Sequence, residues 1–237
     1  KPGRRVEIGQ STGTVQSILE NGNRIIRWDQ AVDEETHGRL ALPHYMNRES
    51  DPEDRDRYQT TFAREEGAIA APTAGLHFTP EILAEIEHTF LTLHVGVGTF
   101  RPVKAEYIKD HDMHAERYHI SEHTAERINN TRALGGRIIA TGTTVTRVLE
   151  SLAREADHGP NTPWQASATS GETDIFINPP HTFKAVDALL TNFHLPQSTL
   201  MMLVSALASR ELIMEAYAKA VEERYRFFSY GDCMLIV

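Results

Sequence analysis

The chain has little cysteine and no long apolar segment. Cys233 is the single cysteine among 237 residues, which excludes an internal disulfide and a zinc or iron–sulfur site with several cysteine ligands. The apolar run 200–207 is much shorter than the ~20 residues of a membrane span. Residues 1–8 are basic and polar, unlike a secretory signal. These absences predict a cytoplasmic protein without a membrane segment.

Positive charge is also scarce. The 24 Lys and Arg residues are outnumbered by 33 Asp and Glu residues, which gives a net charge of -9. A protein that grips nucleic acid by charge alone is usually basic overall. Composition alone therefore favours a small-molecule enzyme, and any RNA contact requires a local basic patch on an acidic body.

The order of apolar runs predicts two domains. Residues 1–48 contain short apolar runs at 15–19 and 24–28 around Asn21-Gly22-Asn23, which is typical of a hairpin in a small β-domain. Residues 49–237 alternate strands and helices. This pattern is typical of an α/β domain with a layered, mixed and largely parallel sheet with flanking helices.

The elements of the second domain follow from capping residues, β-branched runs and apolar periodicity. Four expected helices begin after Thr79, at 124 after Ser121, at 145, and at 199 after Ser198. A last helix is expected to have one apolar face, made of Leu212, Ile213, Ala216, Tyr217, Ala220, Val221 and Tyr225. The expected strands are 68–71, 90–95, 113–120, 137–140, 173–177, 188–193 and 234–237. The charge-dense run 51–57 indicates a solvated helix start that continues through 58–63.

The stretch 72–103 is the most informative part of the chain. Its expected strand ends in Gly96-Val97-Gly98-Thr99, where little side chain separates the backbone from a ligand. Ligands of α/β proteins bind at the carboxyl ends of strands. The first candidates at this edge are His77, His94, Thr99 and Arg101.

Histidines near predicted strand ends are suited to proton transfer near neutral pH, although a lone loop histidine is more often structural. His114 and Glu116 lie two residues apart on the expected strand, so they would share a face and could tune one another, or form an exposed charge pair. His111 and His114 could form half of a metal site. No second cluster supplies further ligands, so no metal is expected.

Thr141-Gly142-Thr143-Thr144 joins an expected strand directly to a helix, which is a favourable site for an anion or nucleotide. It lacks the lysine of a P-loop and the glycine spacing of a dinucleotide fold. Alone, it is compatible with an S-adenosylmethionine-dependent methyltransferase. The basic and aromatic stretch 219–228 could stack RNA bases, as in a non-catalytic RNA-binding protein, or end an amphipathic helix.

Several motifs occur together in a fixed order: PTAGLHFT, LHVGVGTFRPV, MHAERY, IIATGTT, TNFHLPQSTLMMLVSA and RFFSYGDCMLI. Together they resemble the S-adenosylmethionine:tRNA ribosyltransferase-isomerase family of queuosine biosynthesis. The resemblance covers most of 51–237. Residues 1–48 resemble, more loosely, the family's small β-barrel domain, here incomplete.

The resemblance implies an unusual reaction. S-adenosylmethionine would donate its ribosyl part, without a metal, to 7-aminomethyl-7-deazaguanine (preQ1) at the wobble position of a tRNA anticodon stem-loop. The products would be epoxyqueuosine, adenine and methionine. The resemblance also fits a monomer that acts in the cytoplasm.

This reaction needs a base near the sulfonium and an acid that helps adenine to leave. The expected catalytic residues are His114 with Glu116 as its orienting partner, followed by His77 and His194. The expected binding residues are Thr141, Gly142 and Thr143 for the nucleoside or methionine carboxylate, Arg101 and Asn192 for polar substrate atoms, and Tyr230 and Asp232 to close the site.

Overall fold

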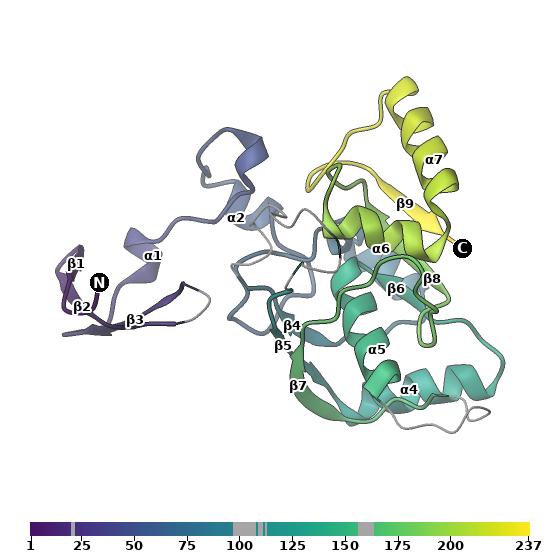
Figure 1. Ribbon diagram of the computed structural model, residues 1–237, viewed down its shortest axis with the longest axis horizontal. Helices are drawn as coiled ribbons and strands as arrows, with labels where there is room; N and C mark the ends of the chain where they lie inside the picture. Colours follow the sequence, from purple (N-terminus) through teal and green to yellow (C-terminus); the bar gives the residue numbers. More distant parts are fainter. Residues whose placement is uncertain (20–21, 97–107, 109–110, 112, 156–163) are drawn as a thin grey trace. The chain divides into compact units, whose positions relative to one another are not determined.

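A computed structural model describes residues 1–19, 22–96, 108, 111, 113–155 and 164–237 (Figure 1). The chain divides into two compact units, Lys1–Ala41 and Leu42–Val237. The division falls before the expected boundary at residues 48 and 49. The assignment of a separate role to each part stays a prediction.

The first unit holds a small antiparallel sheet. Its strands pair in the order β1 (Arg5–Ile8), β2 (Ser11–Ile18) and β3 (Arg24–Trp28), and a short helix follows, α1 (Glu34–His37). Between β2 and β3, the N–H of Leu19 donates to the carbonyl of Asn23 at 2.8 Å. Gly22 has a φ of +82°, which glycine adopts without a steric cost. The predicted hairpin is confirmed, and the closed barrel stays a prediction.

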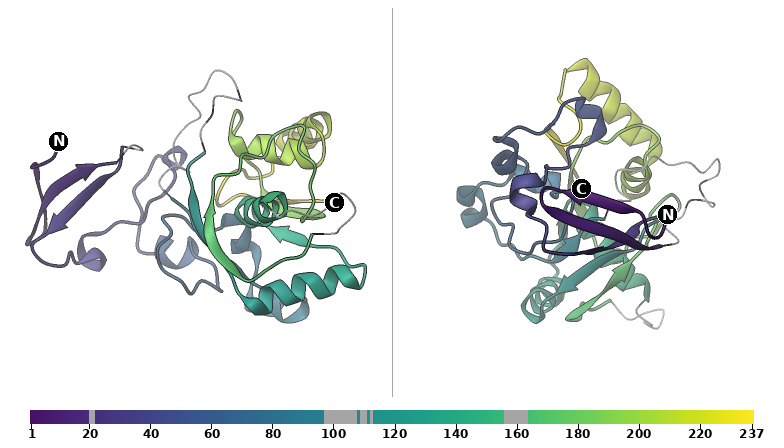
Figure 2. Two further views of the ribbon diagram at one scale, coloured as in Figure 1. Left: turned by 60° about the horizontal axis from the view of Figure 1, so that its bottom comes forward. Right: turned by 90° about the vertical axis from the view of Figure 1, so that its left-hand side faces the viewer.

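The second unit contains two separate small sheets in its described part. One has the antiparallel order β4 (Thr92–His94), β5 (Glu116–Ile120) and β7 (Thr169–Thr173), and β5 and β7 form a curved pair in Figure 2. The other has β6 (Ile139–Thr141) parallel to β8 (Ala188–Asn192), with β9 (Cys233–Ile236) antiparallel to β8. The mixed α/β class is confirmed, but the expectation of one largely parallel sheet is wrong. The reason is that the helices between β5, β6 and β7 connect different sheets.

The helices of the second unit are α2 (Asp54–Arg57), α3 (Pro80–Glu85), α4 (Glu122–Ala133), α5 (Thr143–Glu155), α6 (Thr199–Leu207) and α7 (Arg210–Glu222), with the 3-10 turns η1 (His44–Met46) and η2 (Thr73–His77). The predicted caps are confirmed at three helices, where a hydroxyl of Thr79, Ser121 or Ser198 accepts the N–H of the residue three positions later. Within the described ranges, every helix is too short or too polar to cross a lipid bilayer.

Helix α5 lies at the centre of the second unit and packs against strands of both sheets. It is buried almost all round, including Val148 and Leu149. The core around it also contains Ile120, Ile128, Ile175, Ile177, Leu189, Leu203, Val204, Ile213 and Tyr217. The central position of α5 means that a side chain on its first turns can reach either sheet.

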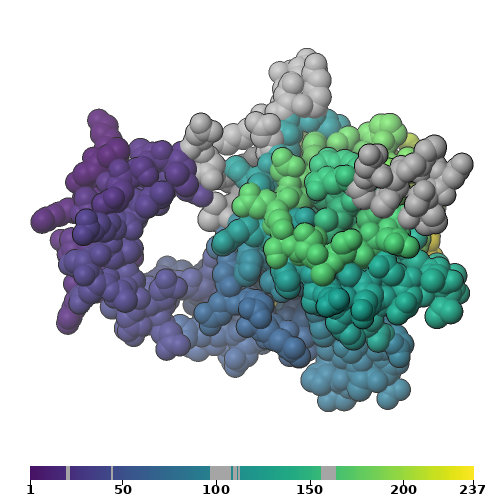
Figure 3. Space-filling view, turned by 90° about the horizontal axis from the view of Figure 1, so that it is seen from below, coloured from purple at the N-terminus to yellow at the C-terminus, as the bar shows by residue number. Residues whose placement is uncertain are grey.

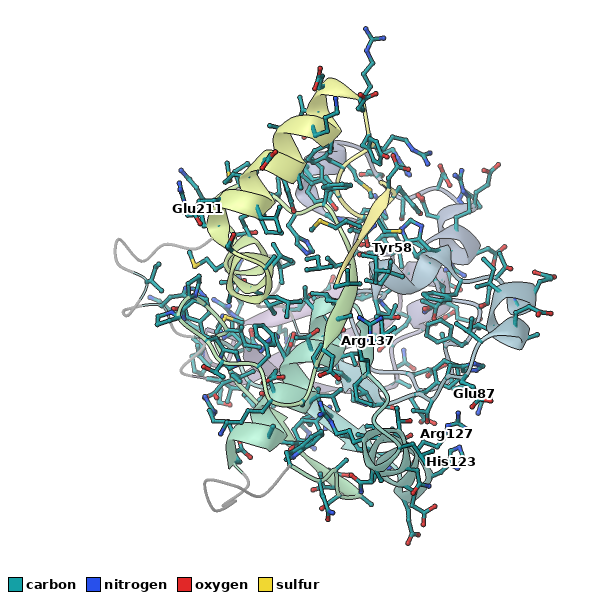
Figure 4. The ribbon with its side chains drawn as sticks, turned by 90° about the vertical axis from the view of Figure 1, so that its right-hand side faces the viewer. Tyr58, Glu87, His123, Arg127, Arg137 and Glu211 are labelled. Carbon is teal, nitrogen blue, oxygen red and sulfur yellow. The ribbon has the colours of Figure 1, made fainter. Side chains whose placement is uncertain are left out.

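Helix α4 closes one side of this core. In Figure 3 its teal surface lies beside the blue surface of the α3 segment. Arg127 of α4 donates to Glu87, and the two side chains lie together in Figure 4. Thr124 also donates to the carbonyl of Phe90 at 2.6 Å. These contacts fix the chain that leads from α3 into β4.

Several expected elements are wrong in the structure. Helix α2 ends at Arg57, because Tyr58 turns inward to Ser229, so 58–63 is not helical. Residues 68–71 form no strand, and among the described residues the N–H of Ile69 donates to the carbonyl of Val95. The strand expected at 173–177 is β7 at Thr169–Thr173. The N–H of Ile175 donates instead to the Thr173 hydroxyl at 3.3 Å, which takes it out of the ladder.

The apolar face expected on the last helix is only partly correct. Ile213, Tyr217 and Ala220 of α7 are buried, whereas Leu212 is 56% exposed and Val221 is 64% exposed. The buried stripe is therefore narrower than the apolar pattern. Tyr225 lies beyond the end of α7 and is half exposed, with its ring near that of Phe193.

Candidate functional site

The carboxyl ends of the parallel strands β6 and β8 form the centre of the candidate site. Thr141 lies opposite Leu190, and the N–H of Gly142 donates to the carbonyl of Leu190 at 2.8 Å. Gly142 has a φ of +90°, so the chain turns directly into α5 at the buried residue Thr143. Gly142 has no side chain with which to cap the first amides of α5. The positive end of the helix therefore faces this edge uncapped by its own N-cap residue.

Helix η2 brings the PTAGLHFT segment against this turn. A Cβ atom added to Gly142 would lie 3.8 Å from the Cβ of Ala74. At the other end of η2, Nε2 of His77 accepts a hydrogen bond from Nδ2 of Asn192 at 3.3 Å. The structure therefore brings together the predicted residues His77, Gly142 and Asn192.

The Asn192 amide also shows which form of His77 is present. Its nitrogen donates to the carbonyl of Gly231 at 3.4 Å, and because a carbonyl only accepts, this contact fixes the orientation of the amide. Nε2 of His77 is then an acceptor, so the proton of the neutral ring lies on Nδ1. Asn192 is 3% exposed, and its Oδ1 has no hydrogen-bond partner among the described residues. A donor group of a ligand would satisfy this oxygen.

The Gly231 loop is anchored by Tyr230 on its other side. The Tyr230 hydroxyl donates to Oδ1 of Asp54 at 2.9 Å, and Arg48 holds the same carboxylate through two contacts of 2.5 and 2.8 Å. Arg48 keeps the pKa of Asp54 well below its usual range, and burial together with Asp54 raises the pKa of Tyr230 to about 12. The Tyr230 hydroxyl therefore points to Asp54, and the residue supports the loop.

Asp232 closes the same loop. Its carboxylate accepts from the N–H of Arg226 at 2.8 Å and from the Arg226 guanidinium at 3.0 Å. These hydrogen bonds lower the pKa of Asp232. Asp232 thereby holds the loop whose Gly231 carbonyl accepts from Asn192, and its expected role in closing the site stays a prediction.

A second cluster lies between α5 and the other sheet. Glu116 of β5 is 4% exposed and Arg147 of α5 is 7% exposed, and Nη1 of Arg147 donates to Oε2 of Glu116 at 2.5 Å. The other oxygen of Glu116 accepts from the N–H of Gly96 at 3.1 Å. Nε of Arg147 donates to the carbonyl of Ile175 at 3.2 Å. This buried ion pair links the end of β4, the start of β5 and the second turn of α5.

His114 does not occupy the expected strand. Strand β5 begins at Glu116, so His114 precedes the ladder and does not share a strand face with Glu116. Glu116 and Tyr118 do lie on one face of β5, and both are buried. The reason is that the β4 pairing begins at His94 opposite Arg117. Arg101 and Thr99 lie outside the described residues.

His194 has a supporting position below the end of β8. Its Nε2 shares a hydrogen bond with the Thr191 hydroxyl at 2.9 Å, and its backbone N–H donates to the Tyr217 hydroxyl at 2.8 Å. Burial lowers the pKa of His194 to about 4, so the ring is neutral at pH 7. His194 thereby connects β8 to α7.

The comparisons with known proteins agree with one another. A family model described as Queuosine biosynthesis protein matches residues 1–236. Proteins named S-adenosylmethionine:tRNA ribosyltransferase-isomerase are 50% identical in Natranaerobius thermophilus, over 100% of this chain and 69% of that protein, and 49% identical in a Thermoanaerobacter species, over 100% and 72%. The chain belongs to the S-adenosylmethionine:tRNA ribosyltransferase-isomerase family.

A solved structure of the family also resembles this chain. It is the S-adenosylmethionine tRNA ribosyltransferase of Thermotoga maritima, which is 35% identical with a TM-score of 0.55 over 100% of this chain and 66% of that chain. The chain therefore spans about two thirds of that relative's length. The segments PTAGLHFT, IIATGTT, TNFHLPQ and SYGDCML come from distant parts of the sequence and lie close together. Asn192 contacts His77 and Gly231, and Gly142 lies beside Ala74 and bonds Leu190.

The sequence reasoning missed Arg147, Asp54 and Arg48. Arg147 carried a weak signal, since it is a charged residue one turn after Thr143 and lies between Val145 and the apolar pair Val148-Leu149. Asp54 was expected in a solvated run, yet it is 2% exposed, because its partners Arg48 and Tyr230 enclose it. No group of three or more His, Cys, Asp or Glu side chains arranged for a metal occurs within the described ranges.

Proposed function

We propose that this chain transfers and isomerises the ribosyl moiety of S-adenosylmethionine onto preQ1 at the wobble position of tRNA, giving epoxyqueuosine with release of adenine and methionine. The observation that carries this proposal is the approach of four distant segments at one edge of the sheet, in a chain that belongs to this family. Asn192 contacts His77 and Gly231, and the Gly142 turn lies beside Ala74 of the His77 segment.

The Gly142 turn supports binding of S-adenosylmethionine. Thr141, Gly142 and Thr143 are proposed to hold the substrate at the positive end of α5, whose first amides begin at Thr143 because the N–H of Gly142 is bonded to Leu190. Ala74 approaches this turn without a bulky side chain. The Oδ1 atom of Asn192 offers an acceptor for an amino or hydroxyl group of the nucleoside. The proposed pocket thus combines an anion-binding end with a hydrogen-bond acceptor.

The reaction divides into steps that need protons to move. A base removes a proton from the carbon next to the sulfonium, the bond between the sugar and adenine breaks, and adenine takes up a proton. The aminomethyl nitrogen of preQ1 forms the new carbon–nitrogen bond to the sugar, and methionine leaves as a thioether when the sulfur–carbon bond breaks. His77 is proposed to assist the departure of adenine by donating a hydrogen bond from its Nδ1–H, because its Nε2 is held by Asn192. His114 is proposed as the base, at the edge where Arg147 fixes Glu116.

The remaining candidates take supporting roles in this proposal. His194 holds β8 to α7, and Tyr230 and Asp232 hold the Gly231 loop over the site. Arg101 is proposed to bind a polar substrate atom. The reaction is proposed to need no metal and to occur in the cytoplasm, with a monomer as the acting form.

The tRNA anticodon stem-loop is the proposed macromolecular partner. The body carries a net charge of -9, so phosphate contacts must come from local basic groups. Strands β1 and β3 place exposed Arg5 and Arg27 on one face, since both pair with Thr14. We propose that this unit belongs to a small β-barrel domain and that the second unit is catalytic.

One labelling experiment tests the function. The protein is incubated with preQ1-bearing tRNA and S-adenosylmethionine labelled either in the ribosyl carbons or in the methyl group. The expected result is ribosyl label on RNA with free adenine and methionine, and no transfer to tRNA that carries guanine instead. Methyl label on RNA with S-adenosylhomocysteine would indicate a methyltransferase. Binding of tRNA without any product would indicate an RNA-binding module.

A further inference from the structure

Arg147 has a buried hydrogen-bonding nitrogen without a partner among the described residues. Its Nε donates to Ile175 and its Nη1 donates to Glu116, but Nη2 is buried and has no hydrogen-bond partner in the part of the chain that the structure describes. A buried donor without an acceptor lowers the stability of the fold, so such a group needs an explanation. A ligand that supplies the acceptor is one such explanation.

The position of this nitrogen suits an anion. Arg147 follows Thr143 by one turn on the 13-residue helix α5, so both side chains project from the same face. Side chains in helices lean towards the N-terminus, which directs the guanidinium towards the first turn. There its charge adds to the positive end of the helix. Among the described residues, a Cβ atom added to Gly96 would meet no atom within 4 Å.

We propose that Nη2 of Arg147, together with the first amides of α5, binds the carboxylate of the methionyl part of S-adenosylmethionine. The inference rests on the proposed function and assigns to it a binding residue. The general chemistry is recognition of an oxyanion, which an RNA phosphate could also supply. The carboxylate fits better, because Arg147 is 7% exposed and a phosphate within an RNA chain binds at exposed basic groups.

The pairing with Glu116 is compatible with this role. Glu116 accepts from Nη1 of the guanidinium with one oxygen and from the N–H of Gly96 with the other. A planar guanidinium can hold two carboxylates at different edges, whereas a lysine ammonium offers only a point charge. The pair therefore orients Nη2 as well as stabilising the buried charge.

The test compares two ligands with one protein. Binding of S-adenosylmethionine and of its decarboxylated analogue is measured by calorimetry for the wild type and for Arg147→Lys, which keeps a cation beside Glu116. The variant should weaken S-adenosylmethionine roughly 10- to 100-fold and leave the analogue unchanged, as expected for the loss of a hydrogen bond to a charged group. The wild type should itself prefer S-adenosylmethionine to the analogue.

Arg132→Lys is the matched control. Arg132 also has a buried nitrogen without a partner, at Nε, and it contacts Asp187 and the carbonyl of Ala185, but it lies on α4. It should bind both ligands as the wild type does. If Arg147→Lys fails to fold, the double variant Glu116→Gln/Arg147→Gln removes the charge pair as a unit and should lose the preference in the same way.

Distinct results would overturn the inference. Equal affinity of the wild type for both ligands, or an equal loss for both in Arg147→Lys, would show that Arg147 does not read the carboxylate. A variant that binds S-adenosylmethionine normally but loses salt-dependent affinity for tRNA would assign the nitrogen to a phosphate. A wild type that binds no S-adenosylmethionine would overturn the proposed function as well.

Discussion

Asn192 donates to Nε2 of His77 at 3.3 Å and thereby joins segments that lie 115 positions apart in the chain. The same amide nitrogen donates to the carbonyl of Gly231. The imidazole is therefore held in one orientation with its proton on Nδ1. A histidine fixed in this way can donate a hydrogen bond from Nδ1–H to a leaving group without first having to rotate.

Replacing His77 by Ala should slow the chemical step more than it weakens binding. A positioned hydrogen-bond donor to developing charge contributes about 100- to 1,000-fold, so kcat should fall within that range while the Kd for S-adenosylmethionine changes little. Single-turnover kinetics of adenine release measure the step. His88→Ala is the control, because His88 is exposed after α3 and should leave the rate unchanged. If His77→Ala releases adenine at the wild-type rate, His77 takes no part in the chemical step.

Gly142 allows a prediction that separates stability from activity. An Ala at its φ of +90° adopts a left-handed conformation, which costs about 1–2 kcal/mol of unfolding free energy. Gly135, at the exposed end of α4, has a φ of +74° and should cost a similar amount as Ala. Only Gly142→Ala should lower kcat/KM, by roughly 10- to 100-fold, since it shifts the turn at the site. Urea unfolding measures the free energy of unfolding, and adenine release measures kcat/KM. Equal activity of Gly142→Ala and Gly135→Ala would contradict the placement of the site at the Gly142 turn.

Glu150 is predicted to be a structural carboxylate of α5. It is 1% exposed and accepts from the N–H groups of Lys184, Ala185 and Val186 at 2.9 to 3.2 Å, and Nε2 of His181 lies 3.2 Å away. Glu150→Gln places an amide N–H₂ where backbone donors already point. The variant should lose about 3 kcal/mol of unfolding free energy.

The control for this prediction lies on the same helix. Glu155→Gln changes an exposed carboxylate at the end of α5, and its effect should stay within about 0.5 kcal/mol. Denaturant unfolding of the three proteins at pH 7 measures the difference. A Glu150→Gln variant as stable as Glu155→Gln would show that the backbone donors find other acceptors.

Local signals in the sequence predicted helix starts well. Thr79, Ser121 and Ser198 each cap a helix through an N–H only three residues away, so the pattern contains both partners. The hairpin between β2 and β3 was likewise predictable from Asn21-Gly22-Asn23. The strands of the sheets were harder to predict. Thr173, Ile175 and Ile177 are buried in alternation, as in a strand, although the backbone has left the ladder at Ile175.

Non-local pairs explain what the sequence could not show at the site. Motifs predicted His77, Gly142 and Asn192, and the structure brings them together. Arg147 meets Glu116 across 31 positions, and Tyr230 meets Asp54 across 176 positions. Nothing in either local pattern reveals the partner. A charged run such as 51–57 therefore appears solvated until the fold encloses one of its members.

The enclosed carboxylate of Asp54 gives a prediction about acid stability. Its pKa lies below the ordinary value of 3.8 because Arg48, the N–H of Asp51 and Tyr230 all donate to the ionised form. A carboxyl whose pKa is lowered by folding stabilises the folded state above its unfolded pKa. This contribution is lost as the pH falls from about 4 towards the lower folded pKa. Protonated Asp54 would also release the Tyr230 hydroxyl and the Gly231 loop.

Comparison of Asp54→Asn with the wild type isolates this contribution. The urea midpoint of the wild type should exceed that of Asp54→Asn at pH 5.5, and the gap should narrow at pH 3, where the wild-type carboxyl begins to lose its ionised advantage. Asp56→Asn, an exposed change on the same short helix α2, should match the wild type at both pH values. A gap that stays constant between pH 5.5 and pH 3 would mean that Asp54 acts through its shape and neutral hydrogen bonds, because only the charge makes its contribution depend on pH.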